Sequence, residues 1–477
     1  MELDKDLKAR QEARCLAKQA EKAARVLADM TQEQLDAITE GIAKAFCDAA
    51  VELAQMAVAE TGFGNTEDKT IKNQFASRCV LDAIRDMKTV GVLNENSREK
   101  LWEVAVPVGV IAAIVPSTNP TSTVCYKAMI SLKAGNAIVF SPHPKALACT
   151  LQAAQIVAKA AVAAGAPEGC VSCLTIPSMD GTQELMRAPE VKLILATGGP
   201  GMVKAAYSSG KPAIGVGAGN GPAYIHHSAD VGRAMDCILR SKTFDNGTVC
   251  ASEQSIILEK AQEEAVIREG KRRGFYFMEE AEAKSLGKIL FKPSGGLDPR
   301  VVGKEAGVLA EMAGFRVPQG TKVLVARERE AGPSVPYSME KLCPVLAFYV
   351  MENEKAVLDK VVEVLVHEGS GHTFSIHAQD DGVIRRFARK VPVSRFLVNT
   401  PSALGGIGQS THLFPALTLG CGAVGGSSSS NNISPMDLIN IRRVAWDSGE
   451  HSPDVHTGKV DEDLVALLTA KILERLQ

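Results

Sequence analysis

The sequence carries almost no net charge and has no long apolar run. Its 53 lysine and arginine residues nearly balance its 55 aspartate and glutamate residues, which leaves a formal net charge of −2. Such a balance offers no electrostatic attraction to nucleic acid or to an anionic membrane. The longest apolar run, around residues 108–115, is too short to span a bilayer and is bounded by prolines. We therefore expect neither nucleic acid nor a membrane as a partner.

A secretory leader and a disulfide framework are also missing. Residues 1–6 are mostly charged and form no apolar signal region. The eleven cysteines are scattered over 477 residues, unlike the dense framework of a small secreted domain. Cys170 and Cys173 have the spacing of a metal-binding pair, but no second pair follows, and structural zinc needs four ligands. The sequence therefore predicts a cytoplasmic protein without a metal centre.

What the sequence does contain is a regular alternation of strand-like and helix-like segments. With 477 residues, 45% of them hydrophobic and 23% charged, the chain has the size for two or three globular domains. Helical patterns fill residues 3–87, where Thr31 and Gln34 have the form of a capping box. Strands and helices then alternate over residues 101–216 and again over residues 230–410. This pattern predicts an α/β fold with two doubly wound, Rossmann-type domains, because such alternation builds parallel sheets with right-handed crossovers.

The most informative stretch is residues 241–254, which contains Cys250. This cysteine lies in the irregular link between a helical pattern and a short β-prone run, just after Gly247, which lets the backbone turn. A buried structural thiol is the alternative interpretation, since free cysteine is usually a core residue. The context Asn-Gly-Thr-Val-Cys-Ala-Ser-Glu resembles the nucleophile loop of the aldehyde dehydrogenase superfamily, and closely resembles its coenzyme A-acylating branch. The resemblance implies that Cys250 is the nucleophile.

A second motif supplies the group that such a nucleophile requires. Attack of a thiolate on an aldehyde gives a tetrahedral oxyanion, which fixed N–H donors must stabilise. Asn119, in the turn formed by residues 115–122, matches the oxyanion-hole asparagine of the superfamily. An asparagine that merely stabilises its own turn is the alternative. Together with Cys250, the motif predicts a catalytic role for Asn119.

The nucleotide site rests on the resemblance, because the glycine-rich run at residues 215–221 does not have GxGxxG spacing. Residues 196–201 match the superfamily's Thr-Gly-Ser segment, with Gly199 in place of the serine, and lead into a helix whose N–H groups suit a pyrophosphate. Glu340 matches the glutamate that holds the nicotinamide ribose, with a solvated loop carboxylate as the alternative. The predicted cofactors are NAD and coenzyme A (CoA), and the predicted cofactor-binding residues are Thr118, Ser141, Pro142, His143, Thr197, Gly198, Gly199, Gly217, Glu340 and Leu342.

Departures from the superfamily pattern indicate which acyl acceptor is used. Hydrolytic relatives carry Lys-Pro-Ser-Glu where this chain has Ser-Pro-His-Pro at residues 141–144, and Glu-Leu-Gly-Gly-Lys where it has Val216 and the four residues that follow. Valine cannot deprotonate water, whereas the thiol of CoA brings its own nucleophile. The resemblance therefore implies conversion of a short-chain aldehyde, acetaldehyde or propionaldehyde, with NAD⁺ and CoA into acyl-CoA and NADH.

Two other functions stay open at this point. One is a hydrolytic NAD(P)-dependent aldehyde dehydrogenase, against which Val216 argues. The other is a non-catalytic cargo or scaffold protein, against which Cys250 and Asn119 argue. The residues do not choose between acetaldehyde and propionaldehyde, or between NAD and NADP.

The predicted organisation is aldehyde dehydrogenase-like, with an added β oligomerisation arm. Residues 1–228 are assigned to the cofactor-binding domain, including an oligomerisation strand near residues 101–115. Residues 229–412 are assigned to the catalytic domain, and residues 413–446 to a return segment with a second oligomerisation strand. Because an unpaired apolar strand edge is a liability, we expect that strand to pair with a neighbouring subunit. The resemblance implies a homodimer or a homotetramer.

The last part of the sequence changes character. Residues 447–460 are polar and turn-rich, typical of a linker, and residues 461–477 predict an amphipathic helix. Leu464, Leu468, Ile472 and Leu476 share one face of this helix, which needs a partner because a short isolated helix is unstable. The segment resembles encapsulation peptides of bacterial microcompartment cargo enzymes, which implies binding to a shell protein inside a microcompartment. Docking on its own subunit is the alternative.

Overall fold

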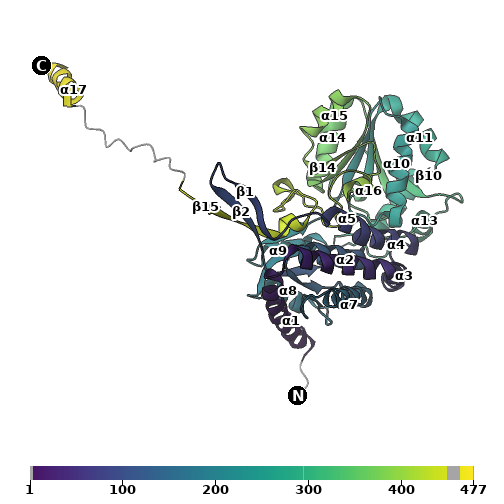
Figure 1. Cartoon of the computed structure of the whole chain (residues 1–477). Helices are drawn as coiled ribbons and strands as arrows, with labels where there is room; N and C mark the ends of the chain where they lie inside the picture. The colour runs from purple at the N-terminus through teal and green to yellow at the C-terminus, as the bar shows by residue number, and fades with distance from the viewer. Residues whose placement is uncertain (1–3, 294, 448–461, 476–477) are drawn as a thin grey trace. The chain divides into compact units, whose positions relative to one another are not determined.

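The computed structural model describes residues 4–293, 295–447 and 462–475 (Figure 1). The chain forms two compact units. The larger unit contains residues 1–90 and 106–440, and the smaller unit contains residues 91–105 and 441–477.

The first sheet of the larger unit has five parallel strands in the order β5-β4-β3-β6-β7. Four helices connect its strands in turn. The first strand of this sheet in chain order is the central β3. Strands β4 and β5 follow on one side of it, and β6 and β7 then follow on the other side. In such sheets the ligand cleft lies at the carboxyl ends of the strands where the order reverses, here β3 and β6. The elements are β3 (Val110–Ile114), α6 (Pro120–Lys133), β4 (Ala137–Ser141), α7 (Leu147–Ala163), β5 (Val171–Cys173), α8 (Met179–Arg187), β6 (Val191–Thr197), α9 (Pro200–Tyr207) and β7 (Ala213–Val216).

A layer of N-terminal helices packs on the first sheet and its helices. The layer consists of α1 (Lys5–Ala28), α2 (Gln32–Asp48), α3 (Ala50–Thr61), α4 (Thr66–Gln74) and α5 (Val80–Ile84), with the π-helical turn η1 (Phe75–Cys79) between the last two. Helix α1 contacts β3 and β4, whereas α2 and α3 contact α6 and α7. Small buried alanines line the inner face of α1, which lets it lie close to α8. The predicted capping box is confirmed: Gln34 N–H donates to the Thr31 hydroxyl, and Thr31 N–H donates to the Gln34 side chain.

One helical stretch of the described chain, Pro144–Ala163, is long and apolar enough to suit a membrane crossing by length and composition. It consists of the 3₁₀ turn η2 (Pro144–Ala146) followed by α7. The stretch packs against α2, α3, α6 and β5, and it buries Ala153, Val157 and Ala161. These contacts account for its apolar composition, because helices inside large domains are apolar for the same reason.

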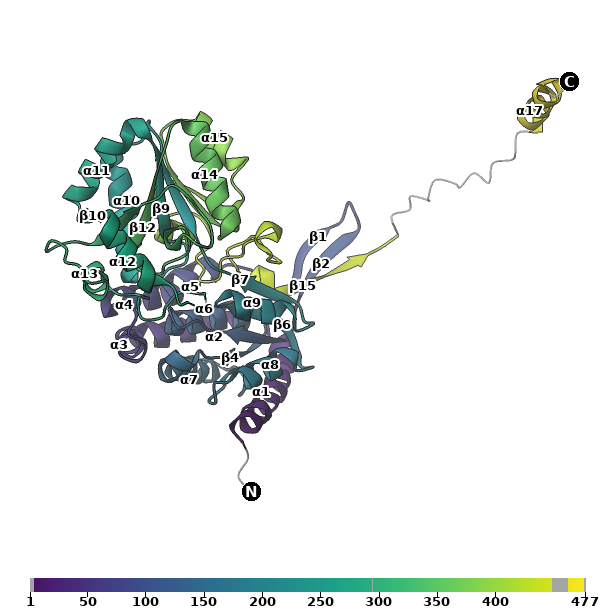
Figure 2. The ribbon, with the colours of Figure 1, turned by 180° about the vertical axis from the view of Figure 1, so that it is seen from behind.

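The second sheet has seven parallel strands in the order β10-β11-β12-β9-β8-β13-β14. Helices α10 and α11 cover one face, and α14 and α15 cover the other (Figures 1 and 2). Side chains of β8 alternate accordingly, with Ala223 and Ile225 packed under the first pair and Tyr224 under the second. The strands are β8 (Gly221–Ile225), β9 (Glu253–Glu259), β10 (Phe275–Phe277), β11 (Val323–Arg327), β12 (Val345–Met351), β13 (Gly371–His377) and β14 (Val393–Val398); the helices are α10 (Val231–Thr243), α11 (Glu263–Arg272), α12 (Glu280–Leu290), α13 (Ala306–Met312), α14 (Glu354–His367), α15 (Asp381–Ala388) and α16 (Ser402–Gly406).

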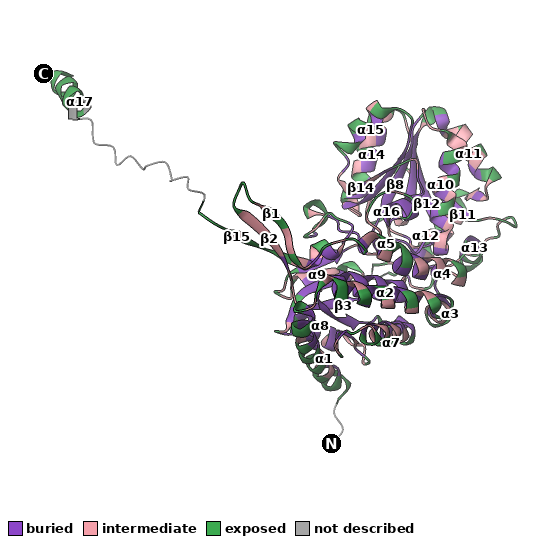
Figure 3. Cartoon of the chain, in the orientation of Figure 1, coloured by how far each residue is buried: buried purple, intermediate pink, exposed green. Residues whose placement is uncertain are grey.

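The chain changes from the first sheet to the second between Val216 and Gly221. Strand β8 therefore pairs in the second sheet, although the sequence-based division at residue 228 groups it with the first. A short buried strand carries no sequence signal that tells which of two parallel sheets it joins. The division into domains itself stays a prediction. In both sheets the central strands are buried, while the outer faces of the covering helices are exposed (Figure 3).

The smaller unit contains a three-stranded sheet in the order β1-β2-β15. Its strands are β1 (Gly91–Asn96), β2 (Leu101–Pro107) and β15 (Ile439–Ala445), and β1 and β2 form an antiparallel hairpin. The rings of Trp102 and Trp446 meet edge to face with centroids 4.9 Å apart. The segment predicted as one strand near residues 101–115 thus divides into β2 and β3. Strand β1 was not predicted, since its sequence is polar and largely exposed.

The C-terminal helix α17 (Glu462–Arg475) lies where a helix was expected. Leu468 and Ile472, on its predicted apolar face, are 52% and 59% exposed. Residues 448–460 of the predicted linker, Leu476 and the side chain of Leu464 lie outside the described residues.

The buried side chain of Arg395 connects the return segment to the second sheet through hydrogen bonds. Arg395, on β14, is among the largest fully buried side chains of the described chain. Its guanidinium donates to the carbonyl oxygens of Gly420 (2.7 Å) and Gly371 (3.3 Å). Burial lowers the pKa of Arg395, and nearby thiols of Cys421 and Cys250 act in the opposite direction.

Replacing Arg395 with methionine should destabilise the protein, because it removes donors from carbonyl groups that stay buried. We expect the free energy of unfolding to fall by about 2–4 kcal/mol, measured as a lower midpoint in urea by circular dichroism. The matched control is Arg385→Met on the exposed surface of α15, for which we expect a change within about 0.5 kcal/mol. Equal midpoints for the two variants would contradict the role given to Arg395.

Candidate active site

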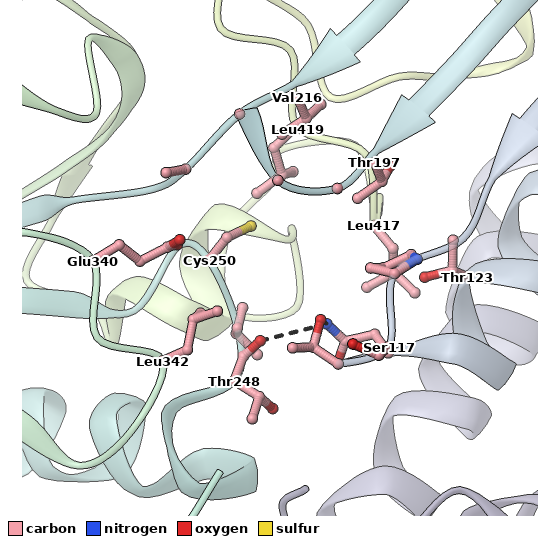
Figure 4. Close-up of a pocket in the computed structure, with 18 of the residues that line it drawn as sticks. Ser117, Thr123, Thr197, Val216, Thr248, Cys250, Glu340, Leu342, Leu417 and Leu419 are labelled. Carbon is pink, nitrogen blue, oxygen red and sulfur yellow. Dashed lines mark hydrogen bonds between the residues drawn. The ribbon is translucent and has the colours of Figure 1, made fainter. Parts of the chain in front are cut away.

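A cavity of about 250 Å³ opens at the carboxyl ends of β3 and β6, where the first sheet reverses its strand order (Figure 4). Residues 116–119 after β3 and residues 197–200 after β6 form one side of it. Residues 216–218, the loop at residues 248–250 and the loop containing Glu340 and Leu342 form the other side. The position is the one that the topology of a doubly wound sheet predicts for a ligand.

The structure brings the predicted site residues together. Ten of them line this cavity: Thr118, Asn119, His143, Thr197, Gly198, Gly199, Gly217, Cys250, Glu340 and Leu342. The other two, Ser141 and Pro142, line an adjoining cavity of about 140 Å³ that shares His143 and residues 197–199 with the first. Motifs scattered over more than two hundred residues of sequence therefore surround one connected space.

Local backbone geometry sets the position of Cys250. The 3₁₀ turn η3 (Phe244–Gly247) precedes it, and Asp245 and Asn246 have φ values of 49° and 50° in the left-handed region. Such values are uncommon outside glycine and persist only where the surroundings hold them. Burial raises the pKa of Cys250 to about 12, with smaller contributions from Glu340 and Cys421, while Arg395 acts in the opposite direction. The thiol is therefore neutral at physiological pH in the protein without ligands.

Glu340 shares the cavity with Cys250 (Figure 4). Burial raises the pKa of Glu340 to about 8, and the neighbouring Glu368 raises it further. One carboxyl oxygen accepts the N–H of Gly219 at 2.9 Å. Among the described residues that line the cavity, Glu340 is the single acidic one, and Val216 lines it without any titratable group.

A group of buried charges behind the cavity was not predicted. Lys69 and Lys72, on α4, both contact the carboxylate of Asp245, at 2.9 and 2.5 Å. Lys72 also donates to Asn119 Oδ1 at 2.6 Å and lines the cavity itself. Charged residues on a polar helix are normally predicted to be solvent-exposed, and Asp245 lies more than 170 residues away in the sequence. The one available indication of a shared role was the i, i+3 spacing of the two lysines, which places them on one face of the helix.

The apolar part of the cavity wall was also missed. Leu417 and Leu419, from the return segment, line the cavity together with Ile407. Their sequence resembles any other turn-rich stretch, so nothing marked them as site residues. They supply the apolar surface on which an alkyl chain can lie.

Two glycines of the cavity leave open space. A Cβ placed on Gly199 or Gly217 would meet no protein atom within 4 Å. The hydroxyl of Thr197 is buried and has no hydrogen-bond partner within the described chain. Open glycine positions beside an unpartnered donor at the start of α9 fit a phosphate-bearing ligand, because helix N-termini attract anions.

A group that could hold a metal ion lies elsewhere. Of the described residues, His226, His227 and Glu259 place one ligand atom each within 4.8 Å of one another. They stand at the carboxyl ends of β8 and β9, whereas Cys250 precedes β9. This group is therefore not part of the cavity.

Comparison with known proteins agrees with this geometry. The sequence matches the aldehyde dehydrogenase family over residues 6–273. The bifunctional aldehyde-alcohol dehydrogenase AdhE of Escherichia coli K12 is 46% identical over 439 residues, which cover 91% of this chain and 49% of AdhE. This chain thus spans about half the length of that relative.

Solved structures match over nearly the whole chain. An acetylating aldehyde dehydrogenase from Geobacillus thermoglucosidasius has 48% identity and a TM-score of 0.92, over 94% of this chain and 99% of that one. Two propionaldehyde dehydrogenases each have 28% identity and a TM-score of 0.82, over 91% of this chain and 97% of theirs. One, from Rhodopseudomonas palustris, contains bound CoA and an acylated cysteine. The other comes from the fucose utilisation microcompartment of Clostridium phytofermentans.

Two doubly wound sheets, with a cavity that contains the Cys250 thiol and the open glycine positions Gly199 and Gly217, define an α/β protein of the nucleotide-binding type. The chain belongs to the aldehyde dehydrogenase family. The predicted family and the predicted fold class are thereby confirmed.

The raised pKa of Cys250 makes a testable prediction about its reactivity. At pH 7 the thiolate fraction should be roughly a thousandfold below that of an ordinary cysteine. In the protein without ligands, we expect iodoacetamide to modify exposed Cys15 before Cys250. The rate at Cys250 should rise about tenfold per pH unit up to pH 10, as followed by mass spectrometry of the two peptides. A rate at Cys250 that is fast and independent of pH would contradict the neutral thiol.

Proposed function

We propose that the protein is a CoA-acylating aldehyde dehydrogenase, which converts a short-chain aldehyde, NAD⁺ and CoA into acyl-CoA and NADH. The observation that carries the proposal is one cavity that holds Cys250, Asn119 and the open glycine turns, with Val216 at the position of the hydrolytic base. The Geobacillus relative, an acetylating enzyme, and the acylated cysteine of the Rhodopseudomonas relative support it.

The residues act in the following order. The thiol of Cys250 loses its proton to solvent, its sulfur attacks the aldehyde carbon, and the carbonyl electron pair moves onto oxygen. The side-chain N–H of Asn119 stabilises this oxyanion. Collapse of the tetrahedral adduct re-forms the carbonyl, breaks the C–H bond of the former aldehyde carbon with loss of hydride, and leaves a thioester on Cys250. NAD⁺, when bound, would supply the acceptor for that hydride. Thr197, Gly199 and Gly217 would hold the pyrophosphate part of the cofactor, and Glu340 its nicotinamide ribose.

The second half-reaction transfers the acyl group. The sulfur of CoA attacks the thioester carbon, the bond to Cys250 Sγ breaks, and acyl-CoA leaves while the thiol of Cys250 is restored. Water would need a base, and the described cavity residues with a group that could accept its proton are Lys72, His143 and Glu340. The carboxyl of Glu340 already accepts an N–H from Gly219. A thiol acceptor removes the need for that base.

The deciding experiment follows NADH absorbance with propionaldehyde and NAD⁺, with and without CoA, in matched samples. We expect the rate of NADH formation to depend strongly on CoA, and the product to be a thioester. Equal multi-turnover rates without CoA, with free acid as product, would contradict the proposal and would instead support a hydrolytic enzyme. Cys250→Ala should abolish NADH formation while the circular dichroism spectrum stays unchanged. Persistent activity of this variant would contradict the role of Cys250.

Restoring a carboxylate at Val216 should restore some hydrolysis. We expect Val216→Glu to raise CoA-independent NADH formation roughly tenfold or more, because a positioned general base contributes a rate factor of that order or larger. Val216→Gln is the matched control, since glutamine has nearly the same size and shape as glutamate but no basicity, and it should leave the rate unchanged. The same increase in both variants would show that altered packing, and not base catalysis, is responsible.

We also propose that the enzyme is a homodimer or homotetramer held together through β15. This strand pairs with β2 on one side only within the described chain, and its residues are largely exposed. A free edge of this kind can extend the sheet of a second subunit. Light scattering of the full chain should give two or four subunit masses, and Ile441→Pro, which removes a backbone donor on β15, should lower that mass. A monomer in the unaltered protein would contradict this proposal.

For its location we propose the cytoplasm, inside a bacterial microcompartment, with α17 bound to a shell protein. Support comes from the exposed apolar residues of α17 and from the microcompartment origin of the Clostridium relative. The double variant Leu468→Glu and Ile472→Glu should lose co-sedimentation with co-expressed shell proteins. Lys471→Glu, on the same helix, should retain it. Equal co-sedimentation of all three proteins would contradict binding through the apolar face.

A further inference from the structure

The orientation of the Asn119 amide is fixed by its contact with Lys72. The Lys72 ammonium lies 2.6 Å from Asn119 Oδ1. An ammonium only donates hydrogen bonds, so it can face only the oxygen of the amide. The amide nitrogen must then point the other way, toward the loop of Cys250. The nitrogen donates to the Thr248 carbonyl of that loop at 3.4 Å (Figure 4) and to the Thr118 hydroxyl at 3.2 Å, distances at or beyond the upper end of the usual range.

Those long contacts leave the amide N–H groups available. Neutral N–H donors prefer about 2.9 Å to an oxygen, and the interaction weakens with distance. A negatively charged oxygen within reach would therefore be a better acceptor than either present partner. Both partners lie beside the cavity that contains Cys250.

The position of Lys72 is itself held from behind. Its ammonium contacts Asp245 at 2.5 Å and the Thr248 hydroxyl at 3.1 Å. Lys69 contacts the same carboxylate at 2.9 Å, and all three charged side chains are at most 3% exposed. The Lys72 ammonium is the positive charge in direct contact with the amide oxygen, and the carboxylates of Asp245 and Asp68 favour its charged form. In a buried setting that charge polarises the amide and favours negative charge on its far side.

We propose that Lys72 is a positioning residue, whose ammonium holds the Asn119 amide with its nitrogen aimed at the carbonyl oxygen of the substrate on Cys250. The proposal rests on the proposed function, because it assumes a carbonyl substrate on that thiol. Lys72 touches neither the substrate nor the reacting atoms in this role and acts through Asn119.

The charge state of Lys72 supports the geometry. Burial lowers the pKa of Lys72 to about 8; Asp245 and Asp68 act against this, while Lys69 lowers it further. The group is therefore charged below about pH 8 and loses its proton above it. A neutral amine has a lone pair that can accept from the amide nitrogen, so the orientation would no longer be enforced.

The test compares Lys72→Met with Lys69→Met. Each variant removes one buried cation from Asp245, but only Lys72 contacts Asn119. We expect Lys72→Met to lower kcat for NADH formation by about 10- to 100-fold, with the KM for aldehyde unchanged within about twofold. Lys69→Met should lose less than about fivefold. Equal losses in the two variants, or an undiminished kcat in Lys72→Met, would overturn the proposal.

Two further measurements separate positioning from a merely structural role. Alkylation of Cys250 by iodoacetamide develops no oxyanion, so its rate should be unchanged in Lys72→Met; a parallel fall would overturn the proposal. In an Asn119→Ala background, adding Lys72→Met should lower kcat no further, because the lysine acts through that amide. A full additional loss in the double variant would overturn it as well.

Lys72→Gln provides a second route if the methionine variant is poorly folded. Its side-chain amide can still donate to Asn119 Oδ1, so we expect part of the lost rate to return, to a level between Lys72→Met and Lys69→Met. A Lys72→Gln rate at or above that of Lys69→Met would overturn the proposal. The unaltered enzyme distinguishes a failure of the proposed function from a failure of the positioning role. Absence of NADH formation in it would contradict the proposed function, whereas an undiminished kcat in Lys72→Met would contradict the positioning role alone.

Discussion

The site depends on one buried carboxylate. Asp245 accepts hydrogen bonds from the ammonium groups of Lys69 and Lys72, from the Thr248 hydroxyl and from the backbone N–H of Asn65. These contacts join the N-terminal helical layer to the loop that carries Cys250. A Cβ on Gly64 would come within 1.7 Å of this carboxylate, so the close approach requires glycine there. Because an unpaired buried charge is costly, each of these partners stabilises the buried carboxylate.

The elements predictable from the sequence were those with local signals. Apolar periodicity gave the alternation of strands and helices, the Thr31 capping box marked the start of α2, and the motifs around Cys250 and Asn119 identified residues that meet in one cavity. The missing parts are set by contacts between distant residues. Nothing near Lys72 in the sequence indicates that Asp245 will neutralise it, and nothing in residues 221–225 tells which sheet they join.

Topology explains why distant motifs converge. The strand order reverses between β3 and β6, so the turns after both strands open at the same edge. The glycine-rich link that follows β7 then carries the chain to the second sheet, and Val216 ends β7 at the cavity wall. The cavity is thus lined by glycines of the turns that follow β6 and β7 in the first sheet, and by Cys250 from the loop before β9 in the second. Its single described acid, Glu340, belongs to the loop before β12.

The central claim is that an acyl group resides on Cys250, and trapping that thioester tests it most directly. The protein is mixed with propionyl-CoA in the absence of NADH, quenched in acid and digested for mass spectrometry. The account predicts one propionyl adduct, on the peptide containing Cys250, which disappears when free CoA is added before the quench. An adduct on another cysteine, or none on Cys250, would contradict the account.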